Sequence, residues 1–120
     1  MARGDRPAPP SASLPPLVES VPNFSEGRRR EVIDDVLAAV RRSGPGTLLD
    51  FSSDPDHNRS VLTLCGLPGA VRAAVEALVS ACVERIDLRA HKGGHPRMGA
   101  VDVIPLIPIR GVTMQDCIRM

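Results

Sequence analysis

Two amphipathic helical patterns, each flanked by runs of β-branched and aliphatic residues, constrain the fold of this 120-residue chain more than any other feature. The first pattern predicts a helix over residues 28–42, ended by Gly44 and Pro45. Its apolar stripe consists of Val32, Ile33, Val36, Leu37 and Val40. A second helix is expected from Pro68, which suits a first turn, to about Ile86. Its inward face is expected to consist of Val71, Val75, Leu78, Val79, Cys82, Val83 and Ile86.

Four extended runs complete the pattern, at residues 17–21, 47–51, 60–65 and 100–104. The resulting order is β-α-β-β-α-β. It predicts an α+β domain of the ferredoxin-like, split β-α-β kind, with a four-stranded antiparallel sheet and two helices on one face. Pro105 and Pro108 favour an edge or an irregular extended run after the last strand.

Domain boundaries follow from composition and from the end of the pattern. Residues 1–16 are rich in Pro, Ala and Ser and lack apolar periodicity, which predicts a disordered leader. Residues 17–120 are assigned to the folded domain. Thr113 is expected to cap a helix that begins shortly before Met120. Because a helix of one or two turns is marginal on its own, the domain is expected to be truncated at its C-terminus.

Composition argues against several kinds of partner. The formal net charge is +1, and the chain has no Trp, no Tyr and two Phe. Neither bulk electrostatics nor base stacking therefore favours a nucleic-acid partner. No apolar run is long enough to cross a bilayer, so no membrane partner is expected. Cys65 and Cys82 lie in apolar patterns and are expected to be buried thiols in a reducing compartment, which predicts a cytoplasmic protein.

The polar residues before the first helix give mixed signals. Ser25 is the expected N-cap of that helix, with Glu26 in its first turn. Arg28, Arg29 and Arg30 follow, although cations are mildly unfavourable at a helix N-terminus. These arginines are either solvated or help to collect an anion.

The chemically richest segment is HKGGHPRMGA, at residues 91–100. Gly93, Gly94 and Pro96 forbid a regular helix, so a loop is expected between the second helix and the last strand. The cationic and titratable residues of this loop are His91, Lys92, His95 and Arg97. Imidazoles and cations, on glycines that let a ligand approach the backbone, suit proton transfer on an anionic substrate.

Three interpretations of this loop remain open. In the first, one histidine is a general acid-base group, Arg97 clamps a carboxylate and Lys92 adds a point charge. In the second, His91 and His95 bind a metal, although that spacing needs a helix to bring the two rings together. In the third, the segment is a polar surface loop whose glycines serve the turn alone.

Other polar residues give weaker signals. Arg59 lies where a loop enters a strand, so it either reaches a ligand or carries a solvated charge. Asn23, beside a helix N-terminus, either binds substrate or holds the turn. His57 precedes the third strand, and its role is left open.

Four segments of the chain carry a family resemblance: VPNFSEG at 21–27, NRSV at 58–61, HKGGHPRMGAVDV at 91–103 and PIRGVT at 108–113. In this order they resemble the N-terminal subdomain of the formiminotransferases, which are glutamate formimidoyltransferases alone or fused to a cyclodeaminase. The resemblance implies transfer of the formimino group of N-formimino-L-glutamate to tetrahydrofolate, in histidine degradation and one-carbon metabolism. It implies that His95 is catalytic, with tetrahydrofolate as co-substrate and no metal.

The resemblance also implies how substrates are bound, because formiminoglutamate and folate both carry glutamate carboxylates. The residues expected to bind substrate are Arg97, Lys92, His91, Arg59 and Asn23. Enzymes of this family add a C-terminal subdomain, so such a subdomain or a homodimer is an expected partner. The alternative is a non-catalytic, stand-alone N-subdomain that binds a folate-like or glutamate-like ligand or a partner subunit.

Overall fold

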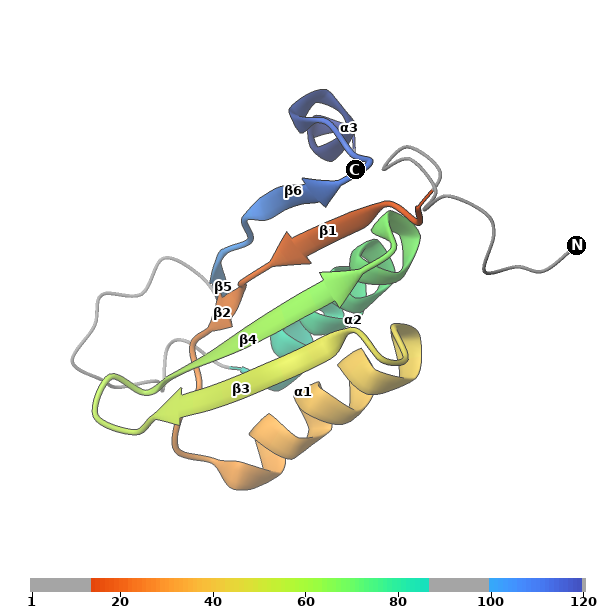
Figure 1. Ribbon diagram of the computed structural model, residues 1–120. Helices are drawn as coiled ribbons and strands as arrows, with labels where there is room; N and C mark the ends of the chain where they lie inside the picture. The colour runs from red at the N-terminus through yellow and green to blue at the C-terminus, as the bar shows by residue number, and fades with distance from the viewer. Residues whose placement is uncertain (1–13, 87–99, 120) are drawn as a thin grey trace, which may run out of the picture.

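A six-stranded antiparallel sheet backed by helices makes up the fold in the computed structural model, which describes residues 14–86 and 100–119 (Figure 1). The strands are β1 (Leu17–Ser20), β2 (Asn23–Phe24), β3 (Leu48–Asp54), β4 (Arg59–Gly66), β5 (Val101–Val103) and β6 (Leu106–Arg110). The helices are α1 (Arg30–Ser43), α2 (Pro68–Arg85) and α3 (Met114–Ile118). The predicted α+β class is confirmed. Most of the predicted leader, residues 1–13, lies outside the described residues.

The strand count differs from the prediction because two strands are interrupted. β4 pairs with β3 on one side and with β1 and then β2 on the other. Ser20 pairs with Leu64 and Asn23 with Val61, so β1 and β2 form one line with a break at residues 21–22. β6 and β5 form a second divided line beside them. A proline, which lacks a backbone donor, lies at each break and turns four predicted strands into six.

Both long helices lie on the same side of the sheet, as Figure 1 shows, and pack against each other. All five residues of the predicted α1 stripe are buried. The buried residues of α2 are Val71, Ala74, Leu78 and Cys82. The prediction for Val83 is wrong, since its side chain is 68% exposed. Val83 follows Cys82 directly, and one residue turns the helix about 100° away from the buried stripe.

The beginning of α1 also differs from the prediction. Arg29 occupies the N-cap position in place of Ser25, without a capping hydrogen bond from its side chain. Phe24 is still paired with β4, so the following residues are needed to cross from the sheet to the helix layer. Glu26 satisfies the first backbone donors instead. Its Oε2 accepts the backbone N–H groups of Arg28 at 3.0 Å and of Arg29 at 2.9 Å.

The predicted cap of the last helix is confirmed. The Thr113 Oγ1 accepts the backbone N–H of Asp116 at 3.0 Å, and the Asp116 carboxylate accepts the backbone N–H of Thr113 at 2.9 Å. This reciprocal pair is a capping box. β6, which precedes this helix, lies at the end of the strand order, as its prolines predicted.

The face of the sheet opposite α1 and α2 is polar at one end. Along β4 the residues on this face are Arg59, Val61, Thr63 and Cys65. Cys65 is therefore only partly buried, and its prediction as a buried thiol is wrong. Cys82 is buried as predicted, and burial raises the pKa of its thiol to about 12. Among the described residues, no helix has the length and apolar character needed to span a membrane.

Candidate functional site

The first component of the site is the turn between β2 and α1, residues 25–29, called the Glu26 turn below. Glu26 is 1% exposed, and its Oε1 accepts the Arg29 Nε–H at 2.7 Å. Burial by itself raises the pKa of this carboxyl. Hydrogen bonds from Arg29 and from the Arg28 backbone outweigh burial, so the pKa of Glu26 lies below its ordinary value. The turn is therefore built around a buried, ionised carboxylate.

The second component is the tip of the β3–β4 hairpin, residues 54–58, called the hairpin tip below. The Asp54 Oδ1 accepts the backbone N–H groups of Asp56 at 2.9 Å and of His57 at 3.3 Å. The His57 ring Nδ1 donates to the other Asp54 oxygen at 2.5 Å. This ring hydrogen bond, with the two backbone donors, lowers the pKa of Asp54. Asn58 closes the tip with φ of 54°, in the left-handed region that asparagine tolerates.

The Glu26 turn and the hairpin tip are joined by short hydrogen bonds. The backbone N–H of Gly27 donates to the Asn58 Oδ1 at 2.7 Å, and the Arg28 Nε–H donates to the Pro55 carbonyl at 2.6 Å. A Cβ at Gly27 would lie 2.4 Å from the Asp54 carbonyl oxygen, so the two backbones approach as closely as glycine permits. The two turns behave as one bonded unit.

The structure brings together two of the residues predicted to bind substrate. Arg59, at the start of β4, donates from its Nε at 3.2 Å and from one terminal nitrogen at 2.8 Å to the Asn23 Oδ1 on β2. The strands are neighbours, which explains the contact across a long sequence separation. These two hydrogen bonds to one neutral amide oxygen fix the plane of the Arg59 guanidinium.

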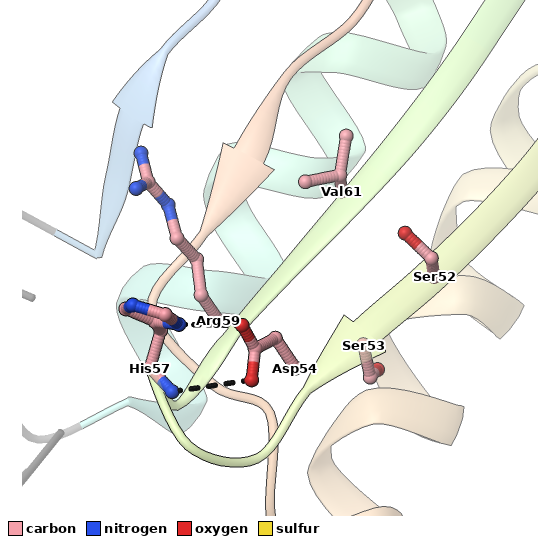
Figure 2. A pocket seen from close by; sticks show the side chains of 6 residues that line it. All are labelled: Ser52, Ser53, Asp54, His57, Arg59 and Val61. Carbon is pink, nitrogen blue, oxygen red and sulfur yellow. Dashed lines mark hydrogen bonds and ion pairs between the residues drawn. The ribbon is translucent and has the colours of Figure 1, made fainter. Parts of the chain in front are cut away.

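A hollow of about 310 Å³ lies beside this pair on the hairpin (Figure 2). Its lining residues are Ser52, Ser53, Asp54, His57, Arg59 and Val61. Figure 2 shows the Arg59 side chain rising from beside the His57 ring, with dashed lines from His57 to Asp54. The hollow is thus lined at one end of the sheet by an imidazole, a guanidinium, a carboxylate and two serine side chains.

The histidine-rich segment attaches to the same region through its flanks. The backbone N–H of Ser25 donates at 2.8 Å to the carbonyl of Ala100, the last residue of the segment. On the N-terminal side of the segment, the Arg85 carbonyl at the end of α2 lies 3.5 Å from a terminal nitrogen of Arg29. Both flanks therefore meet the Glu26 turn. The predicted site residues of the segment itself, His91, Lys92, His95 and Arg97, lie outside the described residues.

The sequence of this chain also matches a known protein family. The family model of the formiminotransferase domain, N-terminal subdomain, matches residues 17–120. This chain belongs to that family. The resemblance inferred from the four sequence segments is thereby confirmed.

Similar members of the formiminotransferase family include proteins of several lengths. The glutamate formimidoyltransferase of Streptococcus pyogenes serotype M1 is 50% identical over 105 residues, which are 87% of this chain and 35% of that protein. The formimidoyltransferase-cyclodeaminase of Sus scrofa is 50% identical over 103 residues, 86% of this chain and 19% of that protein. The glutamate formimidoyltransferase of Thermoplasma acidophilum is 47% identical over 105 residues, 87% of this chain and 34% of that protein. The chain thus spans about a third of the length of these two transferases.

Sequence reasoning missed part of this arrangement. Glu26 was assigned to a helix turn with no role at a site, and Asp54 was not singled out. Of the arginines before α1, Arg28 bonds the hairpin tip and Arg29 bonds the Glu26 carboxylate, so neither is simply solvated. The available signal for Glu26 is its place two residues before a run of three arginines, which puts Arg29 at the i, i+3 spacing of a charge pair. Within the described ranges, no group of three His, Cys, Asp or Glu residues is arranged to hold a metal ion.

Proposed function

We propose that this chain takes part in transfer of the formimino group from N-formimino-L-glutamate to tetrahydrofolate. The observation that carries the proposal is the family match over residues 17–120, a range that includes the whole histidine-rich segment. Relatives half identical to the chain bear the name glutamate formimidoyltransferase or formimidoyltransferase-cyclodeaminase. The reaction belongs to histidine degradation and one-carbon metabolism, and the proposed compartment is the cytoplasm.

The proposed mechanism uses His95 as the proton-transfer group. The N5 lone pair of tetrahydrofolate attacks the amidine carbon, forming a C–N bond and a tetrahedral adduct. The proton on N5 passes to the His95 imidazole, which returns it to the glutamate nitrogen. The bond between the amidine carbon and that nitrogen then breaks. The products are 5-formiminotetrahydrofolate and glutamate, and the balanced steps need tetrahydrofolate as co-substrate but no metal.

The proposed binding residues divide into two groups. Lys92, Arg97 and His91 belong to the same segment as His95 and supply positive or titratable groups for the substrate carboxylates. Arg59 and Asn23 are held together on the sheet, where the Ser25–Ala100 hydrogen bond attaches the end of that segment. A guanidinium fixed by a neutral amide supports a role in anion binding.

The alternative is a non-catalytic N-subdomain that binds a folate-like or glutamate-like ligand or a partner subunit. The share of the relatives that this chain covers supports keeping it, since the chain matches 35% of the Streptococcus pyogenes transferase. In this alternative the same residues bind ligand, and a partner, such as a C-terminal subdomain or a second copy, supplies what turnover needs.

Calorimetric binding of tetrahydrofolate followed by a turnover assay with formiminoglutamate separates the two functions. Turnover supports the transferase, whereas binding without turnover supports the alternative. His95→Ala is expected to abolish turnover and leave the circular dichroism spectrum unchanged. A fully active His95→Ala variant would remove the catalytic assignment. Arg97→Ala is expected chiefly to raise KM for formiminoglutamate, and an unchanged KM would contradict the clamp role.

A further inference from the structure

The hollow on the hairpin contains a histidine that the proposed mechanism does not use. The side chains of His57 and Asp54 are 52% and 49% exposed, so their contact has little packing around it. An exposed ion pair of this kind contributes little to stability. Its geometry is nevertheless specific, because the Asp54 carboxylate also accepts two backbone donors of the tip, on Asp56 and His57. The pair therefore orients the imidazole more than it stabilises the fold.

The orientation has a chemical consequence. The Asp54 carboxylate engages Nδ1 of His57, so that nitrogen carries the proton in the neutral ring and both nitrogens carry one in the cation. The three hydrogen bonds to Asp54 engage both of its oxygens and keep its carboxylate turned toward the tip and the His57 ring. The cationic ring has a second donor, Nε2–H, from which a carboxylate can accept a hydrogen bond.

Arg59 is held for the same purpose by a different partner. Two of its nitrogens bond the Asn23 amide oxygen, and both Arg59 and His57 line the hollow. The Ser52 hydroxyl, from the neighbouring strand β3, lies on the same lining and is a further donor. A volume of about 310 Å³ is at the lower limit for small-molecule sites. It suits a short dicarboxylic acid or one end of a longer ligand.

We propose that this hollow is a carboxylate-binding site, in which Arg59 and His57 bind the carboxylate and Asp54 is the positioning residue for His57. The inference rests on the proposed function for its ligand class, which is the glutamyl carboxylate that formiminoglutamate and folate share. It assigns to the hairpin tip a recognition role outside the histidine-rich segment.

The first test is a titration of the purified chain with glutarate, followed by the ring proton signals of His57 in NMR spectra. His57→Gln identifies these signals by their loss. Glutarate is expected to shift them in a saturable way. Arg59→Gln is expected to weaken glutarate binding roughly tenfold or more, as for the loss of a charged hydrogen bond. Because Arg59→Gln also removes a contact to Asn23, calorimetry on the exposed His57→Gln variant gives a second measure of weakened binding.

Arg72→Gln is the matched control. Arg72 is an exposed arginine on α2 that pairs with Glu76 and does not line the hollow. Its replacement is expected to leave the glutarate titration unchanged. The proposal is overturned if glutarate gives no saturable shift of the His57 signals, or if Arg72→Gln weakens binding as much as Arg59→Gln.

Competition distinguishes the two sources of the carboxylate. Displacement of glutarate by formiminoglutamate alone assigns the site to the donor substrate, and displacement by 4-aminobenzoylglutamate alone assigns it to folate. Displacement by neither overturns the proposal. If the protein turns over formiminoglutamate but glutarate does not shift its His57 signals, this inference is overturned and the proposed function stands. Responsive His57 signals without turnover support the carboxylate site and count against the transferase.

Discussion

Glu26 and Asp54 have the same kinds of hydrogen-bond partner in opposite surroundings. Each carboxylate accepts two backbone N–H groups and one cationic or titratable side chain, Arg29 for Glu26 and His57 for Asp54. Hydrogen bonding leaves the pKa of each carboxyl below its ordinary value. The side chain of Glu26, however, is 1% exposed and that of Asp54 is 49% exposed.

The difference shows that hydrogen bonds alone do not decide what a carboxylate does for a fold. Water can replace Asp54 as the acceptor for its donors, so losing that side chain leaves no group unsatisfied. The Glu26 carboxylate is itself buried, so water reaches its place less easily, and losing that side chain leaves partly buried N–H groups without their acceptor. We infer that Glu26 serves the fold and that Asp54 serves the orientation of His57.

The largest expected effect comes from removing the buried carboxylate. Glu26→Ala should lower the free energy of unfolding by about 3 kcal/mol, because two backbone donors and the Arg29 side chain lose their acceptor. Urea denaturation followed by circular dichroism measures this change. A loss no greater than that of Asp54→Ala would break the comparison between the two carboxylates.

A somewhat smaller loss is expected where the two turns touch. Gly27→Ala should lower the free energy of unfolding by about 2 kcal/mol. The new Cβ would lie 2.4 Å from the Asp54 carbonyl oxygen and 2.5 Å from the backbone nitrogen of Arg59. Gly69→Ala is the matched control, because a Cβ there meets nothing within 4 Å. The control should be neutral or slightly stabilising. Equal losses in the two variants would show that the contact between the turns has no structural importance.

Acid titration sharpens the comparison through the lowered pKa values. A carboxyl whose pKa is lowered by folding stabilises the protein above its ordinary pKa, which is 4.5 for Glu26 and 3.8 for Asp54. That stability is lost as pH falls through the lower folded value. Urea midpoints measured from pH 6 to pH 3 should therefore decrease for the wild-type chain. Glu26→Gln should flatten this decrease more than Asp54→Asn, and the reverse order would contradict the assignment.

The smallest effect on stability is expected at the exposed carboxylate. Asp54→Ala should change the urea midpoint by no more than an ordinary surface substitution, because its donors turn to water. The same variant should still weaken glutarate binding, because the His57 ring loses the acceptor that orients it. A large loss of stability without a change in binding would identify Asp54 as a structural residue like Glu26.

Periodic patterns were the part of the fold that could be predicted. The α1 stripe around Val36 is buried as expected, because helix geometry alone places residues three and four apart on one face. The prediction that Val83 faces inward was wrong, because periodicity does not show how wide the buried stripe of a helix is. The division of two strands also escaped prediction. The first strand was expected to end at residue 21, but pairing resumes at Asn23 because β4 continues alongside.

Residues of the candidate site could be predicted only where the side chain itself indicates a function, such as a charged or amide group. Arg59 and Asn23 were singled out separately, and the structure brings them together because β2 and β4 pair. The bond between Gly27 and Asn58 could not have been foreseen, since it depends on how two turns from distant parts of the chain meet. The roles of His91, Lys92, His95 and Arg97 stay predictions, since these residues lie outside the described ranges.

The pairing of β1 on both sides has a consequence for the order in which the chain is made. β1 lies between β4 and β6, and Leu17 pairs with Arg110. A ribosome therefore releases the first strand long before its last neighbour exists. Until residues 106–110 emerge, one edge of β1 is exposed to pairing with other nascent chains. Contacts of such long sequence separation also slow folding, so assembly of the sheet should await nearly the whole chain.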